Sequence, residues 1–288
     1  MSTQAILERE RRYRRWVAAA SILPLLLLVG ASALQASGAS SSDLVPASLR
    51  AVNEDGAPLL LGSILAAIAF ALPAATLAYL FKAAQARSER MLGALLFLVV
   101  LGPVLFGLQG ILLALSEISV GEKFVAQEGG IGDIYSLSNN LREDSALRTA
   151  AYVTQSIGAM AFVFGMIYVP LWAVRTGLLT RLHGTLGMTL GASLILPFLA
   201  GLTFPMLLAW FMYFGLMLSG RTPKGRPPAW DAGVAVPPPA RGEQPEPLAA
   251  AVGGGIVEGD ATEIPGVDEN PNAARRERAK KRKRKRRR

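Results

Sequence analysis

The amino-acid sequence predicts an all-α protein: a polytopic bundle of about six transmembrane helices, followed by a disordered, proline-rich and basic C-terminal tail. Of its 288 residues, 51% belong to the set AVILMFWYC and only 18% are charged. The apolar residues form long continuous blocks instead of amphipathic periods, and the charges between the blocks alternate in sign. This distribution excludes a soluble globular domain and indicates a multi-pass membrane protein.

A helix that crosses a bilayer needs about 20 apolar residues, because the hydrocarbon core is about 30 Å thick and each residue rises about 1.5 Å. Four blocks without a charged residue meet this requirement, and we expect spans at residues 16–34, 57–81, 91–115 and 151–174. The first block has an alternative interpretation as a cleaved secretory signal, since a basic flank precedes it and the small residues Ala31–Ala33 lie near its end. Either interpretation leaves the other spans unchanged.

The fifth apolar block, Thr185–Ser219, contains 35 residues. It is too long for one ordinary span and just long enough for two short ones. Proline and glycine cluster at its middle, and these residues end one helix and begin the next. We therefore expect a hairpin at about Pro197–Pro205 that joins two spans, 185–200 and 203–219.

The connections between the blocks predict the topology. Their formal charges are +3 for residues 1–16, −2 for 35–56, +2 for 82–90, −3 for 116–150 and +2 for 175–184. Because Lys and Arg are enriched in cytoplasmic loops, the two negative segments are expected to face outward. A transmembrane domain of six spans, residues 16–219, then leaves the basic N-terminus (1–15) and the tail (220–288) on the cytoplasmic side of the membrane.

The segment 220–288 differs in character from the blocks before it. It holds 10 of the 18 prolines and lacks apolar periodicity, so it buries too little surface to offset its chain entropy and is expected to be disordered. Its last part, 275–288, contains twelve Lys and Arg residues and one acid. Such a cluster attracts the anionic lipids of the inner leaflet, with nucleic acid or the ribosome as the competing partner. The candidate contact residues are Arg275, Arg276, Lys280, Lys281, Arg282, Lys283, Arg284, Lys285, Arg286, Arg287 and Arg288.

The sequence offers few residues for chemistry. It has no Cys, which excludes disulfides, thiolate nucleophiles and iron–sulfur clusters, and its single histidine, His183, excludes sites built from two imidazoles. Motifs for a bound nucleotide, a metal or a catalytic triad are also missing from it. We therefore expect no enzymatic activity, no catalytic residue, no metal and no cofactor. His183 is expected in a cytoplasmic turn, where it is solvated or lies among lipid headgroups.

Gln109 is the most polar side chain at the middle depth of the predicted spans, which contain no ionisable residue. It could hydrogen-bond a transported solute or a neighbouring helix, and a contact of the second kind contributes about 0.6–2 kcal/mol. We favour the helix contact. Every predicted span also contains a proline, which is typical both of a kinked scaffold and of the broken helices of transporters.

Two stretches of the sequence are similar to a known family. The run Leu77–Lys82 (LAYLFK) and above all Val174–Gly187 (VRTGLLTRLHGTLG) resemble a bacterial, actinobacterial-like family of six-pass membrane proteins classed as a domain of unknown function. Ser219–Arg221 and Arg226–Trp230 resemble the segment that follows the membrane domain in such proteins. The resemblance covers roughly residues 15–220, and it implies about six helices and residence in a membrane but no activity.

These observations predict an integral membrane protein whose main partner is the lipid bilayer. The first functional hypothesis is a non-enzymatic scaffold or interaction protein of the bacterial plasma membrane. The alternative is a small-solute transporter or channel subunit built on the proline-containing helices. A polar cavity at mid-depth would favour the alternative, and Gln109 is its main candidate residue.

Overall fold

The computed structural model describes residues 2–38, 45–130, 133–196, 200–223 and 225–236. They belong to one compact unit, residues 1–248, and the second unit, residues 249–288, lies outside the described residues. Every regular element in the described part is a helix, which confirms the predicted all-α class. The predictions for residues 237–288, including the basic cluster 275–288 and its eleven candidate contact residues, fall outside the described residues.

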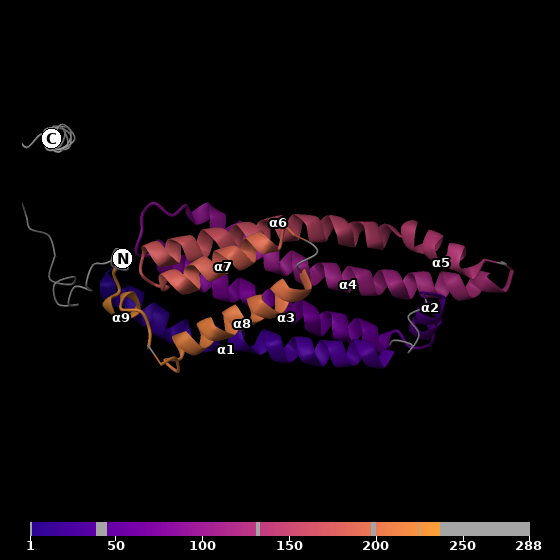
Figure 1. Ribbon diagram of the computed structural model, residues 1–288, viewed down its shortest axis with the longest axis horizontal. Coiled ribbons are helices and arrows are strands. Elements are labelled where there is room, and N and C mark those ends of the chain that lie inside the picture. The colour runs from indigo at the N-terminus through magenta and orange to yellow at the C-terminus, as the bar shows by residue number, and fades with distance from the viewer. Residues whose placement is uncertain (1, 39–44, 131–132, 197–199, 224, 237–288) are drawn as a thin grey trace, which may run out of the picture. The chain divides into compact units, whose positions relative to one another are not determined.

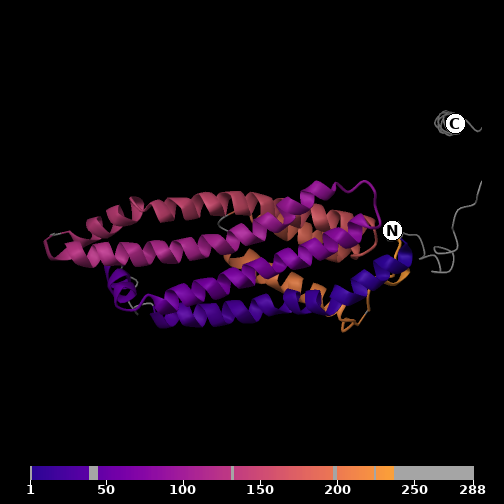
Figure 2. The same cartoon turned by 180° about the vertical axis from the view of Figure 1, so that it is seen from behind.

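Four long helices run side by side (Figures 1 and 2). They are α1 (Thr3–Gly38), α3 (Ala57–Gln85), α4 (Leu96–Gln127) and α6 (Ala146–Arg175). Each contains most or all of one of the first four predicted blocks, and α1 begins early enough to make the basic N-terminus helical. With α8 (Ala200–Leu218), five helices of the described part are long and apolar enough to cross a membrane, which indicates a membrane protein.

The fifth apolar block forms two helices of unequal length, α7 (Arg181–Ser193) and α8. The 13 residues of α7 extend over about 20 Å, which is less than the hydrocarbon thickness of about 30 Å. For this reason α7 is not one of the five candidate spans, and the predicted span 185–200 is not confirmed. Pro205, expected at the hairpin, lies inside α8, whereas Pro197 lies outside the described residues.

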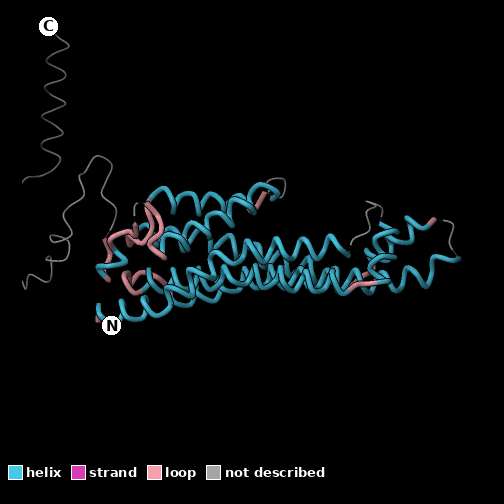
Figure 3. Tube along the Cα trace, turned by 90° about the horizontal axis from the view of Figure 1, so that it is seen from below, coloured by secondary structure: helices cyan, strands magenta, loops and turns pink. Residues whose placement is uncertain are grey.

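The α7–α8 hairpin covers only the half of the long helices that is nearer to the N-terminus (Figures 1 and 3). Phe204, near the beginning of α8, contacts Phe70 of α3 and Phe106 of α4, with ring centroids 5.9 and 5.7 Å apart. Both partner rings lie near the middle of their predicted apolar blocks. The hydroxyl oxygens of Ser193 and Thr203 are 3.1 Å apart and join the two helices beside the turn. The chain therefore reverses at the middle depth of the apolar blocks.

Glycines on α4 allow the long helices to pack closely. A Cβ atom at Gly102 would collide with the backbone of Phe162 on α6, and one at Gly107 would lie 2.7 Å from the carbonyl oxygen of Ala67 on α3. Small residues at such positions let membrane helices approach closely. Because lipid tails are as apolar as the helices, the hydrophobic effect does not drive helices together, and van der Waals packing contributes instead. These two contacts hold α4 between α3 and α6.

The opposite end of the long helices carries two short amphipathic helices, α2 (Val45–Glu54) and α5 (Ile134–Glu143) (Figure 1). The segment between α4 and α6, predicted to face outward, is thus partly helical. The buried residues of this end form a second small core: Leu49, Val120, Phe124 and Leu137. Glu117 of α4 accepts hydrogen bonds from Arg142 at 2.5 Å and from Arg148 at 2.6 Å, which ties α5 and α6 to α4.

Single-cysteine labelling distinguishes a reversal at mid-depth from a sixth full span, and the absence of native Cys makes the experiment direct. Ile195, just after α7, is not covered by the rest of the described chain, and 65% of the residue is exposed. We expect Ile195→Cys in intact cells to react poorly with a membrane-impermeant maleimide, because lipid surrounds this position. Tyr135→Cys, at the opposite end, is the control and should react readily. Equal reaction rates would restore the six-span topology.

Candidate functional site

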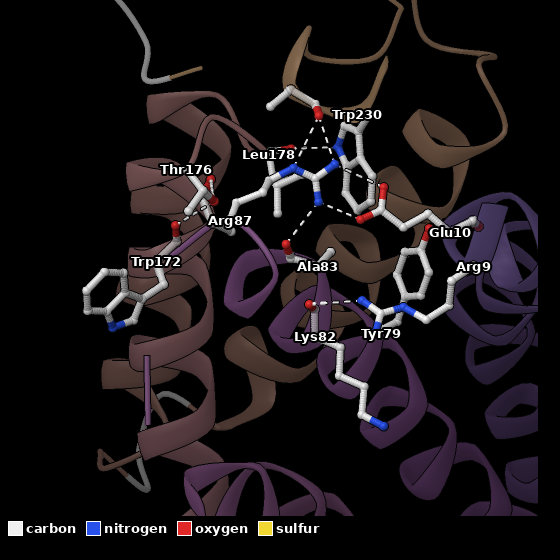
Figure 4. A network of polar contacts seen from close by, with 12 residues as sticks. Arg9, Glu10, Tyr79, Lys82, Ala83, Arg87, Trp172, Thr176, Leu178 and Trp230 are labelled. Carbon is white, nitrogen blue, oxygen red and sulfur yellow. Dashed lines mark hydrogen bonds and ion pairs between the residues drawn. The ribbon is translucent and has the colours of Figure 1, made fainter. Parts of the chain in front are cut away.

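A buried ion pair lies at the end of the helices that holds the N-terminus (Figure 4). The side chain of Arg87, two residues after α3, is 0% exposed, and that of Glu10 on α1 is 7% exposed. The guanidinium atoms Nη1 and Nη2 lie 2.5 and 3.0 Å from the two carboxylate oxygens of Glu10. This bidentate geometry is the one in which Arg–carboxylate pairs are strongest.

The remaining donors of Arg87 are used as well (Figure 4). Nη1 donates to the carbonyl oxygen of Ala83 at 2.9 Å, while Nε and Nη2 donate to that of Ala229 at 3.3 and 2.8 Å. A guanidinium has five N–H groups, and all five have an acceptor here. A buried charge without such partners costs several kcal/mol, so this complete set of acceptors is what allows the pair to be buried.

Trp230 of α9 (Ala229–Ala232) covers the pair. Its ring centroid lies 5.7 Å from Cζ of Arg87, and the ring stacks on Tyr79 with centroids 5.7 Å and planes 7° apart. The indole Nε1 donates to the carbonyl oxygen of Leu178, in the turn between α6 and α7, at 2.9 Å. One side chain therefore joins α3 to the α6–α7 turn. We call Glu10, Tyr79, Arg87 and Trp230 the Arg87 cluster.

The chain after α8 returns to the helix ends and packs there, and we call residues 221–223 and 225–236 the return segment. Trp230 within it is buried, and the backbone N–H of Val236 donates to the carbonyl oxygen of Thr176 at 3.2 Å. The prediction that a disordered tail begins at residue 220 is therefore wrong for the return segment. Its polar, proline-rich composition indicated disorder, but a buried aromatic ring and main-chain hydrogen bonds hold it on the helices.

The first turns of α1 form the other side of the cluster. The backbone carbonyl oxygen of Glu10 accepts a hydrogen bond from Oη of Tyr79 at 3.2 Å, and Arg9 donates to the carbonyl oxygen of Lys82 at 3.4 Å. The basic N-terminus is thus a helical part of the fold that is attached to the end of α3. Sequence reasoning missed Glu10, because one acid among five arginines looks like part of a solvated helix face.

A pocket of about 300 Å³ lies beside the Arg87 cluster, between α1 and the return segment, and we call it the arginine pocket. Its charged lining residues are Glu10, Arg11, Arg14, Arg226 and Asp231. Tyr79 and Trp230 supply aromatic lining. Arg226 pairs with Asp231 at 3.0 Å. The pocket is therefore polar, charged and bounded on two sides by parts of the chain that the Arg87 cluster holds in place.

His183, expected in a solvated turn, is instead buried in the first turn of α7, with 6% of the residue exposed. Its ring stacks on Trp210 of α8, with centroids 4.7 Å and planes 3° apart, and Nε1 of Trp210 donates to the His183 carbonyl oxygen at 2.9 Å. The Nε2 atom has no hydrogen-bond partner among the described residues. Because burial disfavours the charged ring, the pKa of His183 is lowered from 6.5 to about 4.

Gln109 lies on α4, three residues beyond Phe106, and is half-buried. Its amide makes no hydrogen bond within the part of the chain that the structure describes, so the predicted contact with a neighbouring helix is not found there. In the same ranges no three His, Asp or Glu side chains gather as a metal site would require. The buried polar contacts around Arg87 and the arginine pocket lie at the helix ends and not at mid-depth.

The sequence held one signal for the Arg87 cluster. Trp230 is a large aromatic residue in a proline-rich segment, and a tryptophan usually buries its ring and finds a partner for its N–H. The family-like stretches also meet at the cluster: Leu77–Lys82 contains Tyr79, and Val174–Gly187 contains Leu178, the acceptor for Trp230.

Comparison of the chain with protein-family models, with curated proteins and with solved structures gives no match. The resemblance to a bacterial six-pass family therefore stays a prediction that rests on the short stretches named above.

Glu10→Gln should strongly destabilise the protein, because it leaves the buried guanidinium of Arg87 without its counter-charge. Breaking a buried pair from one side costs about 3–5 kcal/mol, which thermal unfolding in detergent would detect. Arg90→Gln removes an exposed charge from the same connection and is the matched control, with an expected change within about 0.5 kcal/mol. Small and equal effects of both substitutions would contradict a buried pair.

The stability of the protein should depend on pH through His183. The folded state holds the ring with a pKa of about 4, whereas the unfolded value is 6.5, so the unfolded state binds more protons between these values. Stability should be constant above about pH 7 and fall as the pH drops through 6.5 towards 4, by about 2 kcal/mol at pH 5.

Thermal unfolding at pH 7.5 and pH 5 measures this effect. His183→Phe keeps an aromatic ring on Trp210 and is the control, since it removes the titrating group alone. The difference in stability between the two pH values should be smaller in the variant. Identical pH dependence in both proteins would mean that other groups are responsible.

Proposed function

We propose that this protein is a non-enzymatic scaffold of the bacterial plasma membrane that fixes the start of its C-terminal tail on the cytoplasmic surface and so tethers a basic segment there, for interaction with a partner. The observation that supports this function is the return segment. The chain leaves α8, comes back to the helix ends and is fixed there by Trp230 and Val236 before the basic cluster 275–288 follows in the sequence.

The end that holds the Arg87 cluster suits the cytoplasmic side. There α1 carries five arginines between residues 9 and 15, and Lys and Arg are enriched in cytoplasmic segments. Trp16, next to them, is 78% exposed on the surface of α1, as expected of an aromatic residue that anchors a helix at the interface. In this orientation the N-terminus and the return segment share the leaflet whose anionic lipids attract basic residues.

Fixing Val236 also fixes the origin of the tail. The 38 residues between Val236 and Arg275 reach at most about 130 Å at about 3.5 Å per residue, which sets the largest distance between the basic cluster and Val236. Tethering raises the effective concentration of the cluster at the membrane surface. Anionic headgroups there attract each nearby Lys or Arg by about 1 kcal/mol, while nucleic acid competes through counterion release. We place lipid first and nucleic acid second.

Crosslinking in cells tests the scaffold function. The full chain carries a photoreactive amino acid at position 274, next to the basic cluster, and a variant with all twelve Lys and Arg residues of 275–288 replaced by Gln is the control. In addition to contacts with anionic lipid, the scaffold function predicts one discrete protein partner that the wild type captures and the control loses. Products that are limited to lipid, or that are the same for both proteins, would contradict it.

A second candidate function, a small-solute transporter or channel subunit, is favoured by the α7–α8 hairpin. Non-helical backbone at membrane depth is tolerated only where protein buries it or where it lines a water-filled cavity. Phe106 contacts the beginning of α8, and Gln109 lies one turn further along the same face of α4. Solute sites of transporters are typically formed near mid-depth by discontinuous helices, and Gln109 is a polar side chain that could add to such a site.

Gln109→Leu separates the two candidate functions. Since the amide makes no hydrogen bond within the described residues, the stability of the variant in detergent should stay within about 0.5 kcal/mol of the wild type. The scaffold predicts unchanged partner capture. A specific loss of solute uptake by cells, at an unchanged amount of protein in the membrane, would favour the transporter instead.

Gly177→Ala should release the return segment from the helix ends. Gly177 has a φ of +75°, where a side chain costs about 1–2 kcal/mol, and its Cβ would overlap the carbonyl oxygen of Val236. Gly220→Ala is the matched control, because Gly220 also has a φ of +75° but open space around it. Amide hydrogen exchange at Trp230 and Val236 should rise in the first variant and stay near wild type in the second. Equal rises would attribute the effect to backbone strain alone.

A further inference from the structure

The arginine pocket offers positive charge that the chain itself does not neutralise. The carboxylate of Glu10 is already paired with the buried Arg87. Arg11 and Arg14 line the pocket as well, and no ion pair within the described ranges involves them. Arg14 lies four residues after Glu10 and three after Arg11, spacings at which side chains on a helix are neighbours, and all three residues line the pocket.

Arg226 approaches the pocket from the return segment. Its partner, Asp231, has a side chain that is 61% exposed, and that of Arg226 is 25% exposed. Ion pairs open to water are weak, so an incoming anion can replace the carboxylate of Asp231 at little cost. Arginines from two separate parts of the chain can then act on one ligand.

We propose that the arginine pocket binds a phosphate group. Guanidiniums present rigid pairs of N–H donors that match the oxygens of phosphate, and three of them, from Arg11, Arg14 and Arg226, line this pocket. Its volume of about 300 Å³ is at the lower end for ligand sites and fits a phosphate with a small polar substituent. The lining residues include none of the basic cluster 275–288, and the proposal does not depend on the scaffold function.

The depth of the pocket points to the headgroup of an anionic lipid as the source of the phosphate. Arg14 lies two residues from Trp16, whose exposed ring marks the level of the headgroups. A soluble phosphate ester would meet the same arginines, so the test needs one arm for each source. In both cases the ligand joins α1 to the return segment and stabilises the folded arrangement of the two.

Native mass spectrometry of the full chain tests the lipid arm. The protein is released from nanodiscs of phosphatidylglycerol or phosphatidylcholine into a neutral detergent with 0.5 M ammonium acetate, where a Debye length of about 4 Å screens the basic cluster. We expect the wild type to retain one phosphatidylglycerol. The double variant Arg11→Gln, Arg14→Gln should weaken retention at least tenfold. The matched control Arg12→Gln, Arg15→Gln changes exposed residues of the same helix that do not line the pocket, and should weaken it less than twofold.

A second arm titrates inorganic phosphate into lipid-free protein and follows hydrogen exchange at Trp230. Protection by phosphate without retention of phosphatidylglycerol would support the site and assign it to soluble phosphates. Arg226→Gln, on the return segment, should weaken binding of the same probe as the α1 double variant does, so the test does not rest on one variant that must fold. Equal weakening by both α1 double variants, or no binding of either probe, would overturn the proposal.

Discussion

The buried guanidinium of Arg87 is the constraint on which this end of the protein depends. Its five N–H groups need acceptors, and these come from three segments: the carboxylate of Glu10 on α1, the carbonyl of Ala83 on α3 and the carbonyl of Ala229 in the return segment. Because a charge that lacks such partners is costly to bury, the three segments come together or not at all. The helical N-terminus, the path of the return segment and the walls of the arginine pocket all follow from this requirement.

At the opposite end of the helices, the central charged group is a carboxylate and its ion pairs are partly exposed. There one carboxylate, Glu117, accepts from two arginines, and all three side chains are 20–26% exposed. Water weakens such pairs, so this end depends more on the apolar contacts around Leu49 and Phe124. The ion pair of Arg87 at one end is thus buried, whereas the ion pairs of Glu117 at the other end remain partly hydrated.

The long helices could be predicted from the sequence because the bilayer sets the minimum length of a span: α3 begins at Ala57, the predicted residue. The fifth block holds parts of two helices, but of these only α8 is long enough to be a candidate span. The depth of the α7–α8 turn could not be predicted, because a run of uncharged residues contains no signal for how deep in the membrane its turn lies. The Arg87 cluster could not be predicted either. Glu10 and Arg87 are 77 residues apart, Arg87 and Ala229 are 142 apart, and counting charges for topology treats every loop arginine as solvated. Only Trp230, an aromatic residue in a proline-rich segment, pointed to packing there.

The distance in sequence between Arg87 and Ala229 also orders the steps of biosynthesis. The carbonyl of Ala229 serves two of the five N–H groups, and it is made 142 residues after the arginine. At about 5–20 residues per second, the ribosome needs about 7–28 s for this interval. Until then the guanidinium keeps its hydration shell at the membrane surface while the later helices insert. Dehydration of the pair is therefore a late event in assembly, and it marks a bundle whose helices have all been synthesised.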